Sequence, residues 1–585
     1  MRDNKVVDEY ELDVRYGSTS LSFEDAPKPT ESFPRRFVDS FRRDSHASFT
    51  DPVHDHTDGF DVEYATAAAA ASPLRRKLKS RHLQMIAIGG SIGTGLFVGA
   101  GRSLATGGPA AALIAFCVVG LMLYATIHAL GEMAVLFPVA GSFSHYSTRF
   151  LDPAWGFAMG WNYAIMWLVL LPLEIVAAAI TVGYWDADIS PAAWVTLFFL
   201  LIVSINLFGV RGYGEAEFMF SIVKVVAVIG FIILGIILNC GGGPGGEYIG
   251  GRYWRDPGAF NNGFKGLCSV FVTAAFTFGG GELVGLAAAE TANPRKSIPT
   301  AVKQTFWRIV LFYIVSMVIV GLLVPYTDKR LLDGSASVDI KASPFVIAIK
   351  DAGIIGLDSV MNVVIMISVL SVGNAAIYGS SRTLAALAEQ RQAPKFLAYI
   401  DRKGRPLVAI LFASTFGFLG FLAATPKQQD AFMWMLATSG LSSVFTWASI
   451  CLSHIRFRRG WKLQGHKLDE LPFQAQGGVI GSWIGFGINI IVLVAQFWTG
   501  FAPIGYGEMS HRARVQNWFS AYLAAPIVLT FYISYKFWFR TSIVRAKDMD
   551  LMTGRRDLSL AHLIAEERAE RMAWPLVKKI YKFFC

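Results

Sequence analysis

The sequence is poor in charged residues. Asp, Glu, Lys and Arg make up 16% of its 585 residues, whereas hydrophobic residues make up 53%. An ordinary soluble domain is roughly 25% charged. A chain of this composition cannot cover its apolar surface with polar groups, so part of that surface must face lipid. A soluble multidomain enzyme, a disordered protein and a secreted disulfide-rich domain are excluded, and we expect an integral membrane protein.

Cysteine is also scarce, and the chain opens without an apolar signal segment. The five cysteines show no Cys-x-x-Cys pair and no spacing to histidine that indicates a zinc site or a disulfide framework. Residues 1–80 are polar throughout, unlike a secretory signal. They are too polar to build a core, so we expect a disordered cytosolic tail.

Long apolar runs dominate the rest of the chain. A bilayer core needs about 20 apolar residues in a helix. Twelve runs meet or approach this length, and we expect an all-α membrane domain at residues 81–540 with twelve transmembrane helices. The runs are 83–104, 110–137, 155–184, 192–208, 218–238, 267–289, 306–324, 346–370 (continuing to about residue 387), 407–423, 432–454, 479–498 and 518–539.

The basic residues indicate the orientation. The net charge is +10, and Lys and Arg are more frequent in the segments after even-numbered spans than in those after odd-numbered ones. The positive-inside rule then places both termini in the cytoplasm. Topology and contact with anionic lipid account for the charge, so no nucleic-acid partner is expected. Residues 541–585 form a second cytosolic tail, in which 557–574 reads as a short amphipathic helix.

Two spans contain glycine clusters that weaken a helix. Span 1 reads IGGSIGTGL at residues 88–96, and span 6 reads FTFGGGE at 276–282. Close packing of helices is one explanation. A phosphate loop is poorly supported, because no Lys-Ser/Thr follows and no strand precedes. Glycine-interrupted spans at matching places of two halves instead indicate the binding site of a secondary transporter.

Broken helices also suggest a class of substrate. Unpaired main-chain groups at membrane depth must line a cavity, because lipid cannot satisfy them. The N-terminus of a half-helix attracts a carboxylate, and freed carbonyls suit an ammonium. A ligand that carries both groups on one carbon is an α-amino acid.

Ionisable residues inside the spans are a further indication of function, because each costs about 2.5–3.5 kcal/mol at a helix centre. They are Glu132, Glu174, Lys224 and Glu282. Burial favours the neutral form of a carboxylic acid, so Glu132 or Glu174 could take up and release a proton. Lys224 could place an ammonium where a sodium ion would otherwise bind, which favours proton coupling. A structural ion pair, or snorkelling near an interface, is the alternative for Glu132 and Lys224.

The motifs together resemble the fungal amino-acid permeases, the yeast amino acid transporter branch of the amino acid–polyamine–organocation superfamily. The match runs from about residue 78 to the C-terminus. It rests on LQMIAIGGSIGTGLF (83–97), GEM (131–133), LPLE (171–174), ELVGLAAAE (282–290), NPRK (293–296), SSR (380–382), DRKGRP (401–406) and HIRFR (454–458).

The resemblance implies a leucine-transporter-type inverted repeat of five plus five helices with two extra helices, working by alternating access and importing amino acids with protons. It implies no cofactor, no metal and no catalytic residue. The residues that would bind the substrate are Ser91, Ile92, Gly93, Thr94 and Gly95 for the carboxylate, and Phe276, Thr277, Phe278 and Gly279, with Glu282 beside them, for the amine and side chain. The coupling residues would be Glu132, Glu174 and Lys224.

The tails carry two further implications of the resemblance. The ending FFC (583–585) is similar to the family's terminal aromatic-Cys motif, which suggests palmitoylation of Cys585. Lys5 and Lys28 are candidate sites for ubiquitination by an endocytic ubiquitin ligase at the plasma membrane. An unmodified tail is the alternative for either lysine.

Three functional hypotheses remain open. The first is a proton-coupled importer of broad amino-acid range, which the absence of an extra intramembrane Asp or Arg for a charged substrate side chain favours. The second is a permease narrowed to proline, basic or acidic amino acids. The third is an amino-acid sensor that signals through its tails. An ion channel would need a ring of like charges, and an enzyme a clustered catalytic constellation; the sequence shows neither.

Overall fold

The computed structural model describes residues 38–43, 60–185, 189–331, 343–425, 428–555 and 574–575. Within these residues the protein is all-helical, with isolated bridges in place of strands. Eight helices there are long and apolar enough to cross a bilayer, and the pair α21–α22, bent by 62°, can form a ninth crossing. Pro191–Leu207 and Leu407–Leu422 are apolar but shorter. The protein is a multi-pass helical membrane protein.

The helices follow one another with short connections. The first part of the chain contains α3 (Val62–Ala70), α4 (Ser80–Gly89), η2 (Gly95–Gly99), α5 (Ala100–Leu136), α6 (Ser142–Phe150), α7 (Pro153–Val182), η3 (Gly183–Trp185), α8 (Pro191–Leu207), α9 (Gly209–Asn239), α10 (Arg252–Arg255), α11 (Gly263–Phe278), α12 (Leu283–Leu286) and η4 (Ala287–Glu290).

The second part contains α13 (Pro294–Arg308), η5 (Ile309–Val315), α14 (Ser316–Leu323), α16 (Pro344–Asp351), α17 (Leu357–Glu389), η7 (Lys395–Ala398), α18 (Leu407–Thr415), η8 (Phe416–Ala424), α19 (Gln428–Leu463), η9 (Leu468–Glu470), α20 (Gly478–Phe501), η10 (Tyr506–Glu508), α21 (His511–Tyr522) and α22 (Ala524–Phe539).

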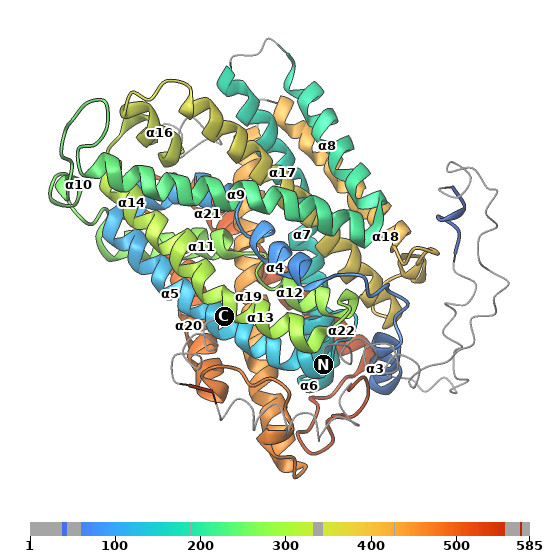
Figure 1. The fold of residues 1–585 in the computed structure, drawn as a ribbon. Coiled ribbons are helices and arrows are strands. Elements are labelled where there is room, and N and C mark those ends of the chain that lie inside the picture. The colour runs from blue at the N-terminus through green and yellow to red at the C-terminus, as the bar shows by residue number, and fades with distance from the viewer. Residues whose placement is uncertain are drawn as a thin grey trace.

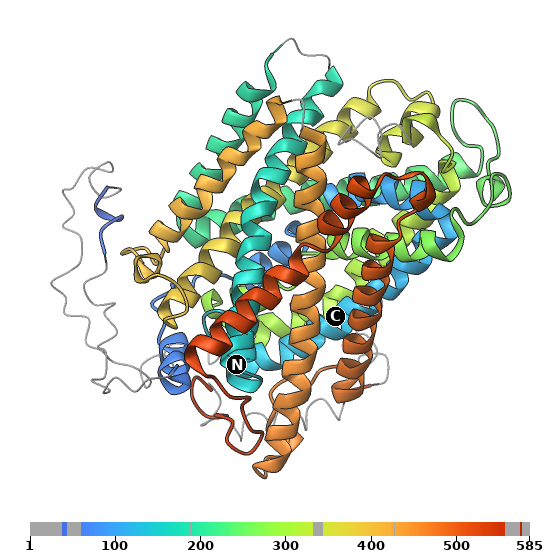
Figure 2. The same cartoon turned by 180° about the vertical axis from the view of Figure 1, so that it is seen from behind.

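Helices from the two parts of the chain are interleaved in space. Helix α7 packs along α17 and α19, α11 packs along α5, and α4 packs against α9. Figure 1 shows α9 crossing the front of the bundle, with α4 and α12 below it near the middle of the view, and the residues of α12 are all buried. From behind, α19 runs the length of the bundle beside α7 and α20 (Figure 2). The broken helices α4–η2 and α11–α12 therefore lie in the interior.

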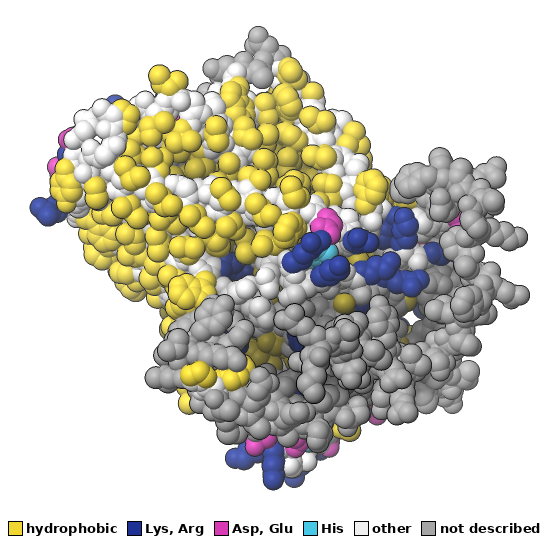
Figure 3. All heavy atoms as spheres, in the orientation of Figure 1, with side chains coloured by type: hydrophobic (Ala, Val, Ile, Leu, Met, Phe, Trp, Pro, Cys, Tyr) yellow, Lys and Arg dark blue, Asp and Glu magenta, His cyan; other side chains and the backbone are white. Residues whose placement is uncertain are grey.

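The surface separates into an apolar and a basic part. Hydrophobic side chains cover the upper part of the face in Figure 3, and Lys and Arg gather below it. Helix α9 contributes Met219, Val226 and Ile233, whose side chains are 63%, 65% and 55% exposed. Such a continuous apolar surface is stable only in contact with lipid.

Two expected boundaries differ from the structure. The span expected at 346–370 is wrong at its start, because α16 and α17 are separate helices. Gly353 and Gly356 lie between them with φ of +69° and +84°, a left-handed backbone that ends a helix. The expected disordered tail at 1–80 is wrong at its end, because α3 is helical and buries Ala65, Ala68 and Ala69. This alanine run stands at the end of a segment that is otherwise polar.

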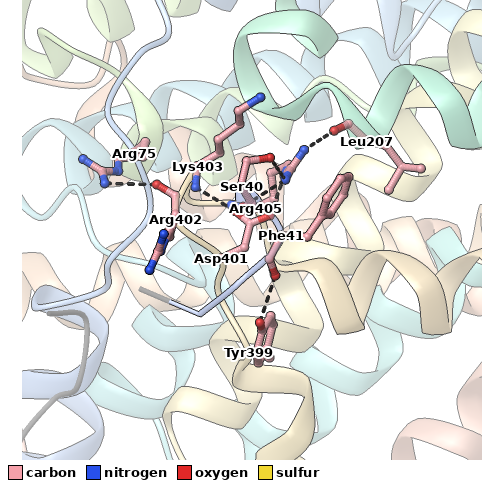
Figure 4. Close-up of polar contacts among 9 residues, drawn as sticks. All are labelled: Ser40, Phe41, Arg75, Leu207, Tyr399, Asp401, Arg402, Lys403 and Arg405. Carbon is pink, nitrogen blue, oxygen red and sulfur yellow. Dashed lines mark hydrogen bonds and ion pairs between the residues drawn. The ribbon is translucent and has the colours of Figure 1, made fainter. Parts of the chain in front are cut away.

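The N-terminal segment 38–43 lies against the loop that follows η7 (Figure 4). The buried Arg405 guanidinium pairs with Asp401 (Nε–Oδ2 2.5 Å) and donates to the Ser40 hydroxyl at 3.0 Å. It also donates to the carbonyl of Leu207 at the end of α8. One arginine thus joins a tail segment, a loop and a helix end.

The segment after α22 returns to α6. Arg149 of α6 donates to the carbonyls of Asp550 and Thr553, and its Nη2 lies 3.2 Å from the Asp550 carboxylate. Burial raises the pKa of the Asp550 carboxyl, but Arg149 and the amides of Met552 and Thr553 outweigh it and hold the pKa below its usual value. Residues 541–555 are therefore part of the folded structure, whereas the expected helix 557–574 (apart from Trp574), Cys585, Lys5 and Lys28 lie outside the described residues.

Candidate functional site

The glycine cluster of span 1 interrupts its helix, as the sequence predicts. Helix α4 ends at Gly89, residues 90–93 are not helical, and η2 begins at Gly95. The first N–H groups of a helical segment have no acceptor within it. The amides next to Gly93 and Thr94 therefore precede the positive end of a half-helix, which is the arrangement that binds an anion.

The glycine cluster of span 6 interrupts its helix next to the first break. Helix α11 ends at Phe278, and Gly280 has a φ of +93°. A Cβ at Gly280 would lie 2.2 Å from the carbonyl oxygen of Gly90. A Cβ at Gly95 would lie 2.5 Å from the Cα of Thr277. Glycine is required at both positions because the two backbones touch there.

A small cavity lies between the two breaks. Its lining residues are Gly90, Ser91, Gly93, Thr94, Gly95, Met166, Trp167, Leu170, Glu174, Phe276, Gly279, Gly280, Val372, Ser439 and Ser443. They come from α7, α17 and α19 as well as from the two breaks. The cavity measures about 20 Å³, which is room for a water but not for an amino acid. A larger ligand requires some of these side chains to move.

Seven of the predicted site residues line this cavity. They are Ser91, Gly93, Thr94, Gly95, Phe276, Gly279 and Glu174. Ile92, Thr277, Phe278, Glu282, Glu132 and Lys224 are not among its lining residues. Phe278 instead packs against Tyr313 with ring centroids 4.2 Å apart, and Thr277 donates to the carbonyl of Gly95 at 3.0 Å. These two residues shape the breaks and do not face the cavity.

Glu174 is the charged side chain of the cavity wall. It is 1% exposed, and the Thr94 hydroxyl donates to its Oε2 at 2.6 Å. Ser439 and Ser443 lie on the wall formed by α19. The Ser439 hydroxyl has no hydrogen-bond partner among the described residues, so it is available to a ligand.

Several main-chain carbonyls of span 1 around the break are engaged within the protein. Side chains of the protein already donate to these oxygens. The pairs are Arg308 Nη1 to Ala87 at 2.5 Å, Lys224 Nζ to Gly89 at 2.6 Å, Tyr313 Oη to Ser91 at 3.0 Å and Thr277 Oγ1 to Gly95 at 3.0 Å. Span 1 therefore offers mainly N–H groups to a ligand, and the carbonyl end of α11 is the better place for an amine.

The ammonium of Lys224 lies at the end of α4, where it donates to the carbonyl of Gly89. It is completely buried and interacts electrostatically with Glu217 and Glu174. Glu217 receives hydrogen bonds from Ser371 at 2.5 Å and Asn374 at 3.3 Å. Glu217 was not predicted from the sequence, although its position seven residues before Lys224 places both on one helix face.

Glu282 and Glu132 lie in other surroundings. Glu282 accepts hydrogen bonds from Trp447 at 3.2 Å and Tyr163 at 3.3 Å, behind the break of span 6. Glu132 lies 2.6 Å from Arg458 Nε and 3.1 Å from His454 Nε2. The structure does not bring Glu132 to the cavity, and its ion pairs join α5 to α19.

The arrangement brings the backbone of two helix breaks and one buried carboxyl group together around a single small cavity. The amino acid permease family model matches residues 82–547 of the chain. The chain belongs to the amino acid permease family. It is therefore a transporter of amino acids and not an enzyme.

Named relatives cover nearly the whole chain. General amino-acid permease GAP2 of Candida albicans is 56% identical over 569 residues, which are 96% of this chain and 95% of the relative. General amino-acid permease GAP1 of Saccharomyces cerevisiae is 54% identical over 560 residues, 94% and 91% of the two chains. The histidine permease of Saccharomyces cerevisiae is 49% identical over 505 residues, 85% and 83%.

Proposed function

We propose that this permease imports a broad range of amino acids together with protons across the plasma membrane by alternating access. The observation that carries the proposal is the cavity between two touching helix breaks. Its wall combines the N–H groups before η2, the open carbonyl end of α11 and the carboxyl of Glu174. The amides bind the substrate carboxylate, the carbonyls bind its amine, and Glu174 carries the proton.

Twelve membrane spans follow from dividing the long helix Gly95–Leu136. Its 42 residues would reach about 63 Å, roughly twice the bilayer core. The backbone at Gly108 is not helical (φ 77°, ψ 172°), and Pro109 follows. The part before the kink completes span 1, and the part after it is span 2. Counting α8, α18–η8 and the pair α21–α22 as one span each completes the twelve.

The two breaks fall on spans 1 and 6, five spans apart. This spacing supports an inverted repeat of five plus five helices, with spans 11 and 12 outside it. The end of the bundle that carries α3, α6 and the basic loops faces the cytoplasm under the positive-inside rule. Both tails are then cytoplasmic.

The lack of a second charged side chain on the cavity wall supports a broad range. Apart from Glu174, the lining residues are glycines, hydroxyl residues and apolar side chains. A dedicated partner for a basic or acidic substrate side chain is missing from this set. The histidine permease among the relatives makes a narrow range the alternative outcome of the same experiment.

A competition panel tests both parts of the proposal. Cells expressing the chain take up one labelled neutral amino acid at two external pH values, with each common amino acid in turn as competitor. Broad competition, faster uptake at the acidic pH and loss of accumulation with a protonophore are expected. Competition by one chemical class only would establish narrow specificity, and dependence on sodium would refute proton coupling.

We also propose that the tails are modified, with palmitate on Cys585 and ubiquitin on Lys5 or Lys28. The similarity of the ending to the family motif supports the first. Palmitate labelling that persists in Cys585→Ser would refute it. Endocytosis that is unaffected when both lysines are replaced by arginine would refute the second.

A further inference from the structure

Arg308 is a buried cation that no part of the predicted site includes. Its side chain is 3% exposed. Nη1 donates to the carbonyl of Ala87 at 2.5 Å, whereas Nε and Nη2 have no hydrogen-bond partner among the described residues. No carboxylate in the described part of the chain lies within 4.0 Å of its nitrogens. Because a buried, unpaired charge costs several kcal/mol, a role in the transport cycle is the default interpretation.

Arg308 holds the end of the half-helix that precedes the first break. Ala87 lies in the last turn of α4, where the carbonyls carry partial negative charge, and its carbonyl also accepts a hydrogen bond from the Ser91 hydroxyl at 2.9 Å. Lys224 occupies the neighbouring carbonyl of Gly89 from α9. The end of α4 is therefore fixed by two cations from two different helices.

The helix that carries Arg308 is modified at this point. Residues Ile309–Val315 form the π-helix η5, with i→i+5 hydrogen bonding. In an α-helix, residues five apart point in different directions. In a π-helix the difference in direction is smaller, and Arg308 and Tyr313 both donate hydrogen bonds to span 1. Tyr313 donates to the carbonyl of Ser91 at 3.0 Å, beyond the glycine pair.

Empty space lies beside α4 at the same place. A cavity of about 180 Å³ separates α4 from α13 and η5, with Gln84 and Ile88 on one wall and Thr305 and Leu311 on the other. Arg308 also lines it. The packing between α4 and α13 is thus incomplete at this place, and the Arg308 hydrogen bond to Ala87 spans the two helices beside the empty space.

The Glu282 carboxylate is a second group that can compensate the charge of the Arg308 guanidinium once it leaves the Ala87 carbonyl. A Cβ at Gly281 would lie 2.7 Å from Arg308 Nη2, so the side chain also borders the break of span 6. Glu282 interacts electrostatically with it. Moving from the Ala87 carbonyl toward the Glu282 carboxylate keeps the charge compensated.

We propose that Arg308 is a positioning residue that holds α4 against the substrate cavity and releases Ala87 when α4 moves to open that cavity toward the cytoplasm. The proposal rests on the alternating-access function proposed above. In this proposal α13 and η5 hold α4 in place, independently of Glu132 and Glu174, the carboxyl groups expected to couple transport to protons.

The test measures how readily α4 opens. A reporter cysteine replaces Ile88 in a chain whose five cysteines are changed to serine or alanine. The protein is reconstituted in liposomes and labelled from the cytoplasmic face with a membrane-impermeant thiol reagent. Removing a hydrogen bond from a charged donor shifts an equilibrium by roughly tenfold or more. Arg308→Gln is therefore expected to increase the labelling rate by about tenfold.

Two further variants separate positioning from folding. Arg308→Lys keeps a cationic donor and is expected to restore labelling to within about threefold of the parent, which loss of packing alone would not allow. Tyr313→Phe removes the second donor on the same face and is expected to raise labelling by a smaller factor. It also keeps the proposal testable if Arg308→Gln does not fold.

The outcomes distinguish this inference from the proposed function. If the parent protein accumulates amino acids and both Arg308→Gln and Tyr313→Phe label at the parent rate, the positioning role is refuted and the transport function stands. If the parent shows neither uptake nor a change of labelling with amino acids, alternating access itself fails.

Discussion

The hydrogen bond between Thr94 and Glu174 leads to a quantitative prediction about pH. The hydroxyl lies 2.6 Å from Glu174 Oε2 in a site where the carboxyl is 1% exposed. A hydroxyl that donates to a carboxylate stabilises its ionised form. Thr94→Val removes the donor with little change of shape, so protonation of Glu174 becomes easier.

The size of the effect follows from the strength of such a bond. A hydrogen bond to a charged group is worth about 1.5–3 kcal/mol, and about 1.4 kcal/mol corresponds to one pH unit. When Glu174 is protonated, its own O–H can donate a hydrogen bond to another group, which offsets part of this free energy. We therefore expect the external pH of half-maximal uptake to rise by about 1 unit in Thr94→Val.

Thr94→Ser is the matched control, because it keeps the hydroxyl and loses only a methyl group. Initial uptake of a labelled neutral amino acid is measured between pH 4 and pH 8 at saturating substrate, with surface abundance measured in parallel. The serine variant is expected to keep the parent pH profile. A downward shift in Thr94→Val, or the same profile in both variants, would show that Glu174 is not the titrating group.

Two further predictions concern the breaks and the second buried carboxyl. Gly280→Ala should abolish uptake, because the new methyl group would lie 2.2 Å from the Gly90 carbonyl oxygen and the backbone φ there is +93°. The control Gly230→Ala should transport normally, because no atom lies within 4 Å of the added methyl group. Equal uptake by the two variants would contradict the close approach of the two helix breaks. Glu132→Gln should lower stability by about 3 kcal/mol, because it leaves Arg458 buried without its charge partner. Thermal unfolding in detergent measures the loss of stability. If Glu132→Gln folds normally but its uptake shows a shifted pH profile, Glu132 takes part in proton coupling instead.

The helix breaks were predictable because their signal is local. Three consecutive glycines at residues 279–281 and four glycines within residues 89–95 disfavour a helix whatever surrounds them. Glu174 was predictable for a similar reason, because a carboxyl in the middle of a long apolar run is conspicuous. Both features were found at the cavity.

Residues near the ends of apolar runs were missed. Arg308 follows Trp307 at the start of the expected span 306–324, a position at which an arginine is expected to lie at the membrane–water interface. Helix α13 begins at Pro294, however, so Arg308 lies well inside the bundle. Glu217 precedes the expected span 218–238 by one residue, whereas α9 begins at Gly209. Hydropathy locates the centre of a helix better than its ends.

Long-range partners were also beyond a single sequence. Glu132 was expected in the coupling network because it is buried in span 2. Its burial is explained by Arg458 and His454, more than three hundred residues later in the chain. Nothing in the local pattern around Glu132 distinguishes a structural ion pair from a proton site.

The most direct test is an experimental structure of the permease with a bound amino acid. The account predicts that the ligand lies in the cavity that Gly93, Phe276 and Ser439 line. Its carboxylate is expected within hydrogen-bonding distance of the amides that precede η2, and its amine at the carbonyl end of α11. Trp167 or Phe276 will have moved to enlarge the cavity. A ligand bound elsewhere, or continuous helices through both glycine clusters, would contradict it.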